Sequence, residues 1–406
     1  MVISKFTHRM LFFVLTLMMV LFYLYKQPQI LAGNGKGWDG KYYSAMYNDF
    51  KNGEKSDIIP PFCKRVGLPY LASRINIPES KSFLYINLMC GFLATIFVFL
   101  TVSDKFTMAV SWFCSLPMIF YIFSPIRFPD FYPFTVDPPA IASLAIGVFF
   151  FSRKAYVISG LMLSVGVFFR ESNVYYLYLF MIFALIEEMG NKNNKRCVFL
   201  LIVVGLGYFV LRYCNSIYDC DTSQIRVAYR WARIKLSDPL EILRMFAAIS
   251  LTIAPFLYRI FILSNKKRFN IKYNSSLAYL GGFVLATAMA FVGGYDTTRI
   301  FYFSYPAYVV ILATFAKNNN LFEVLCLSAS GLIANKFINI IPEPETYLPQ
   351  NDIFGWFSFN PEYAHISISA GIICYWIVCF FVIHSLSARI YNDKELDNVN
   401  YGENAK

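Results

Sequence analysis

A series of long apolar runs recurs from one end of this chain to the other. Many of these runs approach the roughly 20 residues that an α-helix needs to cross about 30 Å of hydrocarbon. Hydrophobic residues fill 57% of the 406 positions and charged residues only 15%, whereas an ordinary soluble chain carries roughly a quarter charged residues. The runs do not alternate polar and apolar residues, as the strands of an outer-membrane barrel do. The sequence therefore predicts an all-α, polytopic membrane protein.

We predict about 12 transmembrane helices in a single domain that covers residues 1–406. Lys5 and Arg9 precede the first apolar run, so the chain is expected to start in the cytoplasm. No small-residue cleavage site follows that run, which favours an uncleaved anchor over a signal peptide. The predicted spans lie at about 11–31, 82–102, 106–123, a fourth ending at 152, 155–169, a sixth ending at 187–188, 198–213, an eighth ending before 266, 277–294, a tenth ending at 317, 321–341 and 366–386.

This topology places the densest basic clusters of the short loops inside and leaves long outer loops at 32–81, 214–240 and 342–365. Two of these outer loops also carry several lysines and arginines, and long loops translocate despite their charge. Contact with lipid headgroups and binding of phosphate both explain such residues. Apolar residues at helical spacing predict interfacial helices within Pro60–Ile77 and Ser223–Leu243.

The net charge and the positions of the cysteines and histidines limit the partners, disulfides and metal sites that this chain is expected to have. The net charge of +11 suits cytoplasmic anchoring and anionic ligands, but no basic soluble face for a nucleic acid is present. The partners expected in addition to a substrate are membrane lipids. Cys214 and Cys220 bracket one outer loop, where they either form a disulfide or remain free thiols. The histidines lie far apart and there is no Cys-x-x-Cys pair, so we predict no metal site and no cofactor, with a divalent metal left open.

The first polar group on the predicted outer face is Asp39, which lies among Trp38, Tyr42 and Tyr43. A carboxylate held there at a membrane boundary is oriented and partly dehydrated, as suits a general base that must reach a hydroxyl. The alternative is an interfacial turn, because aromatic residues belong at headgroup level and Asp-Gly is a common turn pair.

A second group lies before the fourth span, where the loop carries Arg127, Asp130 and Asp137. Asp137 is followed by two prolines, so the favoured interpretation is a cap on the free amides of the helix. A carboxylate facing a cavity is the alternative. Asp130 has no comparable structural role, which makes it a candidate for the site.

Two further pairs, Arg170 with Glu171 and Asp296 with Arg299, lie tightly between predicted spans. Charged residues near the membrane usually face a cavity or a partner. A pair simply exposed to water is the alternative for Arg170 and Glu171. Two arginines on one face offer forked donors that suit phosphate oxygens.

The order of these elements resembles the GT-C superfamily of polytopic membrane glycosyltransferases, in particular bacterial polysaccharide-cluster members. The resemblance covers residues 1–190 as a GT-C-like core, with 191–406 as additional helices. The elements that carry it are Asp39-Gly40-Lys41-Tyr42-Tyr43, the basic stretch from Lys64 to Pro69, Asp137-Pro138, Arg170-Glu171, and Asp296-x-x-Arg299 with Pro306 beyond.

The resemblance implies an inverting glycosyltransferase of the bacterial inner membrane whose active site faces the periplasm. Its donor would be a sugar on a polyprenyl phosphate, and its acceptor a surface polysaccharide or a lipid-linked glycan. Asp39 would act as the base, with Asp130 or Asp137 as a second acid or an orienting group. Arg170 and Arg299 would hold the departing phosphate. The other residues expected to bind substrate are Tyr42, Tyr43, Arg65, Arg127, Glu171 and Asp296.

Three alternatives stay open. An O-antigen polymerase typically relies on arginine-bearing outer loops, and the 214–240 loop carries four basic residues. A flippase for lipid-linked oligosaccharides would use the same arginines, although transporters tend to contain internal repeats and broken mid-span helices. A non-catalytic membrane scaffold has no need of charged residues wedged beside short spans. The absence of a large soluble domain after the last span argues against protein glycosylation.

Overall fold

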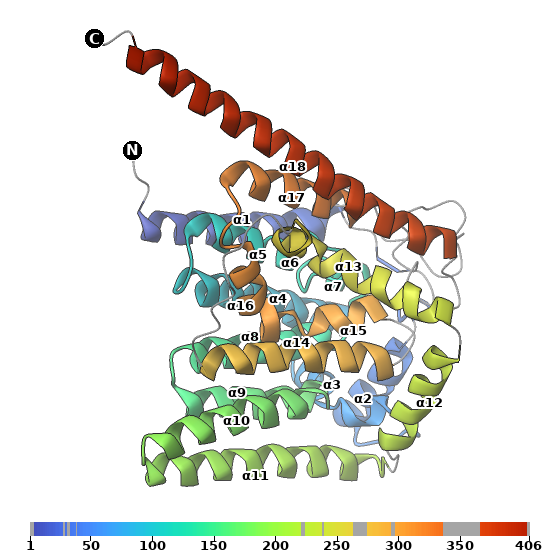
Figure 1. Cartoon of the computed structure of the whole chain (residues 1–406). Coiled ribbons are helices and arrows are strands. Elements are labelled where there is room, and N and C mark those ends of the chain that lie inside the picture. The colour runs from blue at the N-terminus through green and yellow to red at the C-terminus, as the bar shows by residue number, and fades with distance from the viewer. Residues whose placement is uncertain are drawn as a thin grey trace.

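The structure is a computed structural model of the chain. It describes residues 4–26, 29–30, 33–37, 39–220, 224–237, 239–262, 274–293, 297–335 and 366–403, and at 224–225, 274–275, 366–368 and 391–403 it describes the backbone alone. Every regular element in these ranges is a helix (Figure 1). The predicted all-α class is therefore confirmed.

The helices follow one another through short connections. In chain order they are α1 (Lys5–Lys26), α2 (Gly40–Asn52), η1 (Phe62–Lys64), α3 (Gly67–Ser73), α4 (Glu79–Ser103), α5 (Met108–Ser115), α6 (Pro117–Phe120), α7 (Phe128–Phe131), α8 (Asp137–Ser152), α9 (Tyr156–Phe169), α10 (Asn173–Gly190), α11 (Asn194–Ile217), α12 (Gln224–Leu236), α13 (Pro239–Phe261), α14 (Asn274–Val292), α15 (Thr297–Phe303), α16 (Tyr305–Ala316), α17 (Leu321–Ala334) and α18 (Ile366–Glu403).

Within the described ranges, five helices are long and apolar enough to cross a membrane: α1, α4, α11, α13 and the Ser369–Ile390 part of α18. The pair α15–α16 makes a sixth candidate if its two pieces, bent by 81°, form one span. Further apolar helices are shorter, among them α8, α9 and α17. The chain is thus a helical protein with several helices that can span a membrane, and the predicted number of crossings stays a prediction.

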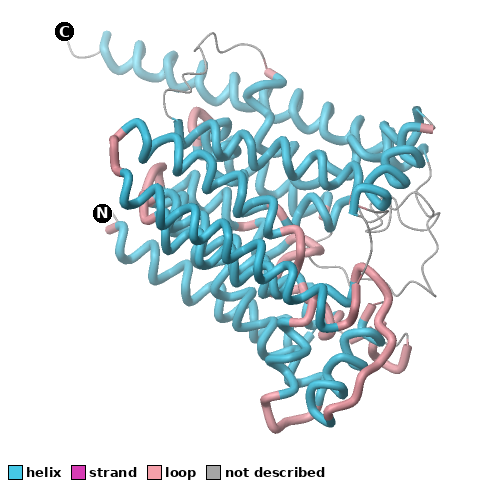
Figure 2. The backbone as a smooth tube through the Cα atoms, turned by 90° about the horizontal axis from the view of Figure 1, so that it is seen from below, coloured by secondary structure: helices cyan, strands magenta, loops and turns pink. Residues whose placement is uncertain are grey.

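The long helices run side by side, and several short helices lie together at one end of the bundle. Figure 1 shows α2, α3 and α12 together at that end, which we call the α2 end, while the start of α1 and the end of α18 lie toward the other. In Figure 2 the long loops beside these short helices lie at the same end. The helices α3 and α12 fall within the two predicted interfacial segments, although α12 ends at Leu236 and α13 begins at Pro239.

The opposite end of the bundle is joined by ion pairs between helix termini. Asp104 accepts from Arg9 at 2.8 Å and from Arg153 at 2.7 Å, and Glu188 pairs with Arg196 at 3.1 Å. These residues belong to the segments that the sequence assigns to the cytoplasmic side. Their common location agrees with that assignment, while the compartment itself stays a prediction.

Tyrosine hydroxyl groups bond to backbone carbonyl groups where helices break. The break between α5 and α6 comes at Pro117, and Pro306 follows the bend between α15 and α16; proline has no amide hydrogen to donate. Near these breaks Tyr302 donates to the carbonyl oxygen of Pro117 at 2.7 Å, and Tyr305 to that of Cys114 at 2.6 Å. The Pro117 carbonyl oxygen also accepts from the Tyr121 amide at 3.3 Å, so the Tyr302 hydroxyl is an additional donor at this break.

One disulfide joins two parts of the α2 end, and it is not the pair that the sequence offered. Cys63 is bonded to Cys220, with their Cα atoms 5.9 Å apart. Cys214 is buried within α11 and its thiol is free, so a Cys214–Cys220 disulfide is wrong. Only five residues lie between the two cysteines in sequence, but Cys214 lies in the last turns of α11, whereas Cys220 follows the end of α11 and is bonded to the first outer loop.

Candidate functional site

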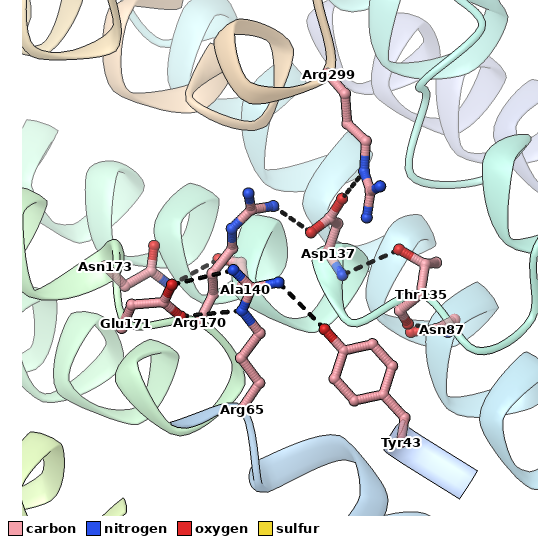
Figure 3. Close-up of polar contacts among 10 residues, drawn as sticks. All are labelled: Tyr43, Arg65, Asn87, Thr135, Asp137, Ala140, Arg170, Glu171, Asn173 and Arg299. Carbon is pink, nitrogen blue, oxygen red and sulfur yellow. Dashed lines mark hydrogen bonds and ion pairs between the residues drawn. The ribbon is translucent and has the colours of Figure 1, made fainter. Parts of the chain in front are cut away.

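The site is centred on the carboxylate of Asp137, which accepts hydrogen bonds from two arginines (Figure 3). Arg170, at the end of α9, donates to Oδ1, and Nε of Arg299, on α15, donates to Oδ2 at 2.6 Å. Asp137 is 5% exposed and Arg170 is 9% exposed. The Arg170 guanidinium also lies 4.5 Å from the ring centroid of Phe303, and that of Arg299 lies 5.3 Å from that of Phe128.

The capping role favoured for Asp137 is wrong. Asp137 is the first residue of α8, the N-cap position belongs to Val136, and the Asp137 amide itself donates to the Thr135 hydroxyl at 3.4 Å, so the Asp137 carboxylate does not cap the helix. Pro138 and Pro139 lack amide hydrogens, so the first turn has fewer free donors for a carboxylate to satisfy. The two arginines take its oxygens instead.

A second ion pair lies beside the first, between Arg65 and Glu171. Nε and Nη2 of Arg65 each donate to one carboxylate oxygen at 3.0 Å, the forked geometry that makes arginine pairs directional. Nη1 of Arg65 donates to the Tyr43 hydroxyl at 3.1 Å. Arg170 and Glu171 therefore do not form the water-exposed pair that was considered as the alternative, because each has a partner from another part of the chain.

The pKa of Glu171 depends on this pairing. Burial alone would raise the pKa of its carboxyl group, yet the charge and hydrogen bonds of Arg65, with Arg170 nearby, hold that pKa below its usual range. Arg65 responds in the reciprocal sense, because Glu171 and Tyr43 outweigh the effect of burial and raise its pKa. Both groups are charged at neutral pH.

Close packing of a glycine brings the Arg65 segment to the end of α9. A β-carbon at Gly67 would lie 2.9 Å from the carbonyl oxygen of Phe168, a contact that real β-carbons essentially never make. Arg65 lies two residues before this contact and Arg170 two residues after Phe168. The absence of a side chain at position 67 therefore allows the two ion pairs to lie next to each other.

Asp39 lies at the start of α2, within electrostatic reach of the same group. Its backbone amide donates to the Tyr132 hydroxyl at 3.1 Å, and its half-buried carboxylate forms no cap on α2. Burial, and then the Asp39 carboxylate, raise the pKa of Tyr132, whereas Arg299 acts in the opposite direction. Asp39 and Arg299 thus both lie near one tyrosine hydroxyl. Within the described residues no hydrogen bond or ion pair engages the Asp39 carboxylate.

A cavity of about 390 Å³ opens beside the two ion pairs, a volume within the usual range of ligand pockets. Its polar wall is strongly basic and contains Lys64, Arg65, Arg170 and Arg230, with Glu171 as the acidic residue. Lys64 and Arg65 are 3% and 8% exposed, so their charges are held in place by the fold. Another part of the lining is apolar and is formed by residues such as Met289, Val292 and Ile300.

The helix α12 lines part of this cavity, which was not predicted from the sequence. Val227, Ala228, Arg230 and Trp231 line the cavity. Their spacing of one, three and four residues is that of one face of a helix, which is the signal that identifies them. From the sequence we expected the basic residues of this loop to contact headgroups or phosphate, and we did not assign any of them to the site.

The remaining candidates have different positions. Tyr43 is buried against Arg65, and Tyr42 stacks on Phe62 with ring centroids 4.7 Å apart. Arg127 is 1% exposed and donates to the carbonyl oxygen of Phe120 at 3.2 Å. Asp130 is 2% exposed, and neither of its oxygens has a hydrogen-bond partner in the described structure. None of these four residues lines the cavity. Tyr43 contributes to it indirectly, because its hydroxyl holds Arg65.

Part of the predicted outer face lies outside the described residues. Asp296 and Trp38 lie outside the described residues. Within the described ranges, no group of three or more His, Cys, Asp or Glu side chains is placed to hold a metal ion. The arrangement thus offers fixed cationic donors next to an apolar wall, and an unengaged carboxylate nearby.

We predict that Asp137→Asn lowers the stability of the protein, because it leaves two arginines without their shared charge. Removing one partner of a buried ion pair typically costs about 3–5 kcal/mol. The measurement is the apparent unfolding midpoint in detergent at a fixed scan rate. Asp57→Asn, an exposed acid of the first outer loop, is the matched control and should leave the midpoint unchanged. Equal midpoints for both variants and the wild type contradict a structural role for the bridge.

We predict a pH-dependent stability from Asp130. Burial raises the pKa of its carboxyl group to about 8, whereas an aspartate in an unfolded chain titrates at about 4. Between these values the native protein keeps a proton that the unfolded chain has released, so stability falls as pH rises. Asp130→Asn removes this titration. Its unfolding midpoint should match the wild type at pH 4 and exceed it increasingly up to pH 8; parallel curves contradict the prediction.

Comparison with known proteins gives no independent indication of function: no family model, no curated protein and no solved structure matches this chain. The function is therefore argued from the side chains themselves, namely the Asp137 bridge, the Arg65–Glu171 pair, the basic cavity and Asp39.

Proposed function

We propose that this chain is a membrane glycosyltransferase of the GT-C type. It transfers a sugar from a polyprenyl-phosphate-linked donor to a surface polysaccharide or a lipid-linked acceptor, at the outer face of a bacterial inner membrane. The observation that carries the proposal is the convergence of Arg170 and Arg299 on Asp137, next to a basic cavity and near Asp39. These residues come from segments far apart in the chain and meet at the α2 end.

The proposal includes a topology of twelve crossings with the α2 end in the periplasm. Each predicted span overlaps a described helix or helix pair, of which five are long and apolar enough to cross a membrane and several are shorter. The Cys63–Cys220 disulfide at the α2 end favours an oxidising compartment on that side. The ion pairs around Asp104 then face the cytoplasm.

The donor phosphate lies in the basic cavity. In and beside it, five cationic side chains meet two carboxylates, those of Asp137 and Glu171, so that positive charge remains for an anionic ligand. As the glycosidic bond breaks, negative charge grows on the departing phosphate, and donors already fixed in place stabilise that charge most. Asp137 holds Arg170 and Arg299 in position before the substrate arrives.

The lipid chain of the donor lies along the apolar wall. Met289, Val292 and Ile300 form this wall next to the basic one, so the cavity matches a molecule with an anionic head and an apolar tail. The helix α12 covers the cavity with both kinds of residue, since Arg230 and Trp231 line it together. An indole ring with a polar tip suits the boundary between hydrocarbon and headgroups.

Asp39 acts on the acceptor. Its carboxylate is half-buried and, among the described residues, is not engaged by any hydrogen bond or ion pair, so it is available to accept a proton from an acceptor hydroxyl. The leaving phosphate needs little protonation, so one base suffices. This differs from glycoside hydrolases, which use two carboxylates. Asp137, by contrast, is committed to the two arginines and serves as the orienting acid.

A glycan polymerase is the second candidate, favoured by the position of Arg230. This arginine comes from the basic outer loop and lines the cavity itself. A polymerase adds whole repeat units, so its product is a ladder of repeat masses. A glycosyltransferase adds a single sugar mass.

We predict that Asp39→Asn abolishes transfer, since it keeps the size of the side chain and removes the base. General base catalysis contributes about 10²–10⁴-fold, so the rate should fall at least about 100-fold. The measurement is mass spectrometry of lipid-linked and surface glycans in cells that express the protein, compared with cells that lack it. Asp57→Asn is the control. The mass increment of the wild type at normal yield in Asp39→Asn would end the catalytic assignment.

We predict that Arg170→Lys reduces transfer about 100-fold, because a point charge replaces a forked donor that reaches both Asp137 and the phosphate. Arg74→Lys, which changes an exposed arginine at the α2 end, is the matched control. The unfolding midpoint of each variant is measured in parallel, to separate catalysis from stability. A folded Arg170→Lys protein with wild-type turnover speaks against a phosphate role for Arg170.

A further inference from the structure

Two of the segments that line the cavity are linked by a disulfide close to the lining residues. One wall is the stretch Pro60–Arg65 of the first outer loop, and the other is the N-terminal half of α12. Cys63 lies two residues before Arg65, and Cys220 lies four residues before the first residue of α12. The Cys63–Cys220 disulfide therefore connects the two walls close to the residues that line the cavity.

The Arg65 side chain is held by Glu171 and Tyr43, so the question is what holds the segment that precedes it. Between α2 and α3 its regular structure is the three-residue η1. Tyr218, just after α11, donates to the Asp49 carboxylate at 3.0 Å and so holds the start of the loop. Lys55 pairs with Asp219 at 3.0 Å, but these side chains are 62% and 84% exposed, and exposed pairs contribute about 0–1 kcal/mol. The disulfide is the covalent link between this segment and the chain that leads into α12.

The far end of α12 is held in a different way. The ammonium group of Lys235 is buried and donates to the carbonyl oxygen of Ala290 at 2.6 Å and to the Thr297 hydroxyl at 3.1 Å. These contacts anchor the C-terminal part of α12 to α14 and α15. With Lys235 at one end and the disulfide before the other, α12 is held on both sides of the residues that line the cavity.

We infer that Cys63 and Cys220 are a positioning pair that fixes the spacing between the Arg65 wall and α12, and thereby the shape of the basic cavity. The inference rests on the proposed function for the identity of the ligand, a lipid with an anionic phosphate headgroup. The disulfide forms by exchange with an oxidised dithiol carrier. The two thiols lose two protons and two electrons, and the carrier leaves as a dithiol. The cavity then reaches its final shape only after the α2 end has entered an oxidising compartment.

Amide hydrogen exchange tests the positioning role without any substrate. In the purified full chain, Cys63→Ser/Cys220→Ser should exchange at least about tenfold faster than wild type in both 53–66 and 224–236, because local opening is no longer restrained. Exchange in α4 and α8 should not change. Cys214→Ser, which removes a free buried thiol of α11 and leaves the disulfide intact, is the matched control. Unchanged exchange in both walls of the double variant overturns the inference.

Thiol chemistry provides the second measurement. In wild-type membranes, maleimide should label Cys63 and Cys220 only after reduction, and labelling before reduction overturns the inference. Bridging the reduced thiols with dibromobimane should restore slow exchange in both walls. If exchange in both segments stays fast after the thiols have been bridged, the covalent link between Cys63 and Cys220 does not hold these segments in place, and the inference is overturned. These results do not involve turnover, so they are distinct from Asp39→Asn, which decides the proposed function.

Discussion

The charge of a single carboxylate, that of Asp137, organises the α2 end of this protein. Burying an ion costs several kcal/mol, and this cost is offset only where partners and hydrogen bonds meet it with good geometry. Arg170 and Arg299 supply those partners from the end of α9 and from α15. The bridge thus joins three parts of the chain and at the same time holds two guanidinium groups beside a cavity. The same interaction serves stability and prepares the site.

The neighbouring pair of Arg65 and Glu171 extends this arrangement toward the first outer loop. Its forked hydrogen bonds and the Tyr43 hydroxyl fix the guanidinium of Arg65 on the basic wall. Arg170 lies next to Glu171 in sequence but pairs with a different acid. Adjacent residues thereby connect two ion pairs into one group, which ties the position of α2 to that of α8 and α15. A displacement of any one segment changes the charge pattern of the cavity.

Much of this molecule could be predicted from its sequence, but the pairings could not. Apolar runs identified the helices, and isolated charges at their ends identified Asp137, Arg170, Glu171 and Arg299 as a group on one side. Arg65 was added by the family resemblance. The partners of these charges are up to 162 residues apart, and no local spacing encodes which arginine meets which acid. The same reason explains the disulfide, since Cys220 bonds to a residue 157 positions away rather than to its neighbour in sequence. Asp137 was assigned to capping because local rules favour it, and tertiary contacts overrode them.

The tyrosines at the helix breaks have a consequence for the composition of the bundle. The chain contains 29 tyrosines, and membrane proteins usually place tyrosine at headgroup level. Here Tyr302 and Tyr305 are buried, and their phenol groups bond to carbonyl groups of Pro117 and Cys114 in place of water. Some of the tyrosines thus supply hydrogen-bond donors inside the bundle, at positions where helices are interrupted. Phenylalanine has the same shape at these positions but supplies no donor: the Cys114 carbonyl oxygen would lose the Tyr305 hydroxyl, whereas that of Pro117 would keep the Tyr121 amide. The aromatic residues of this interior are therefore not interchangeable.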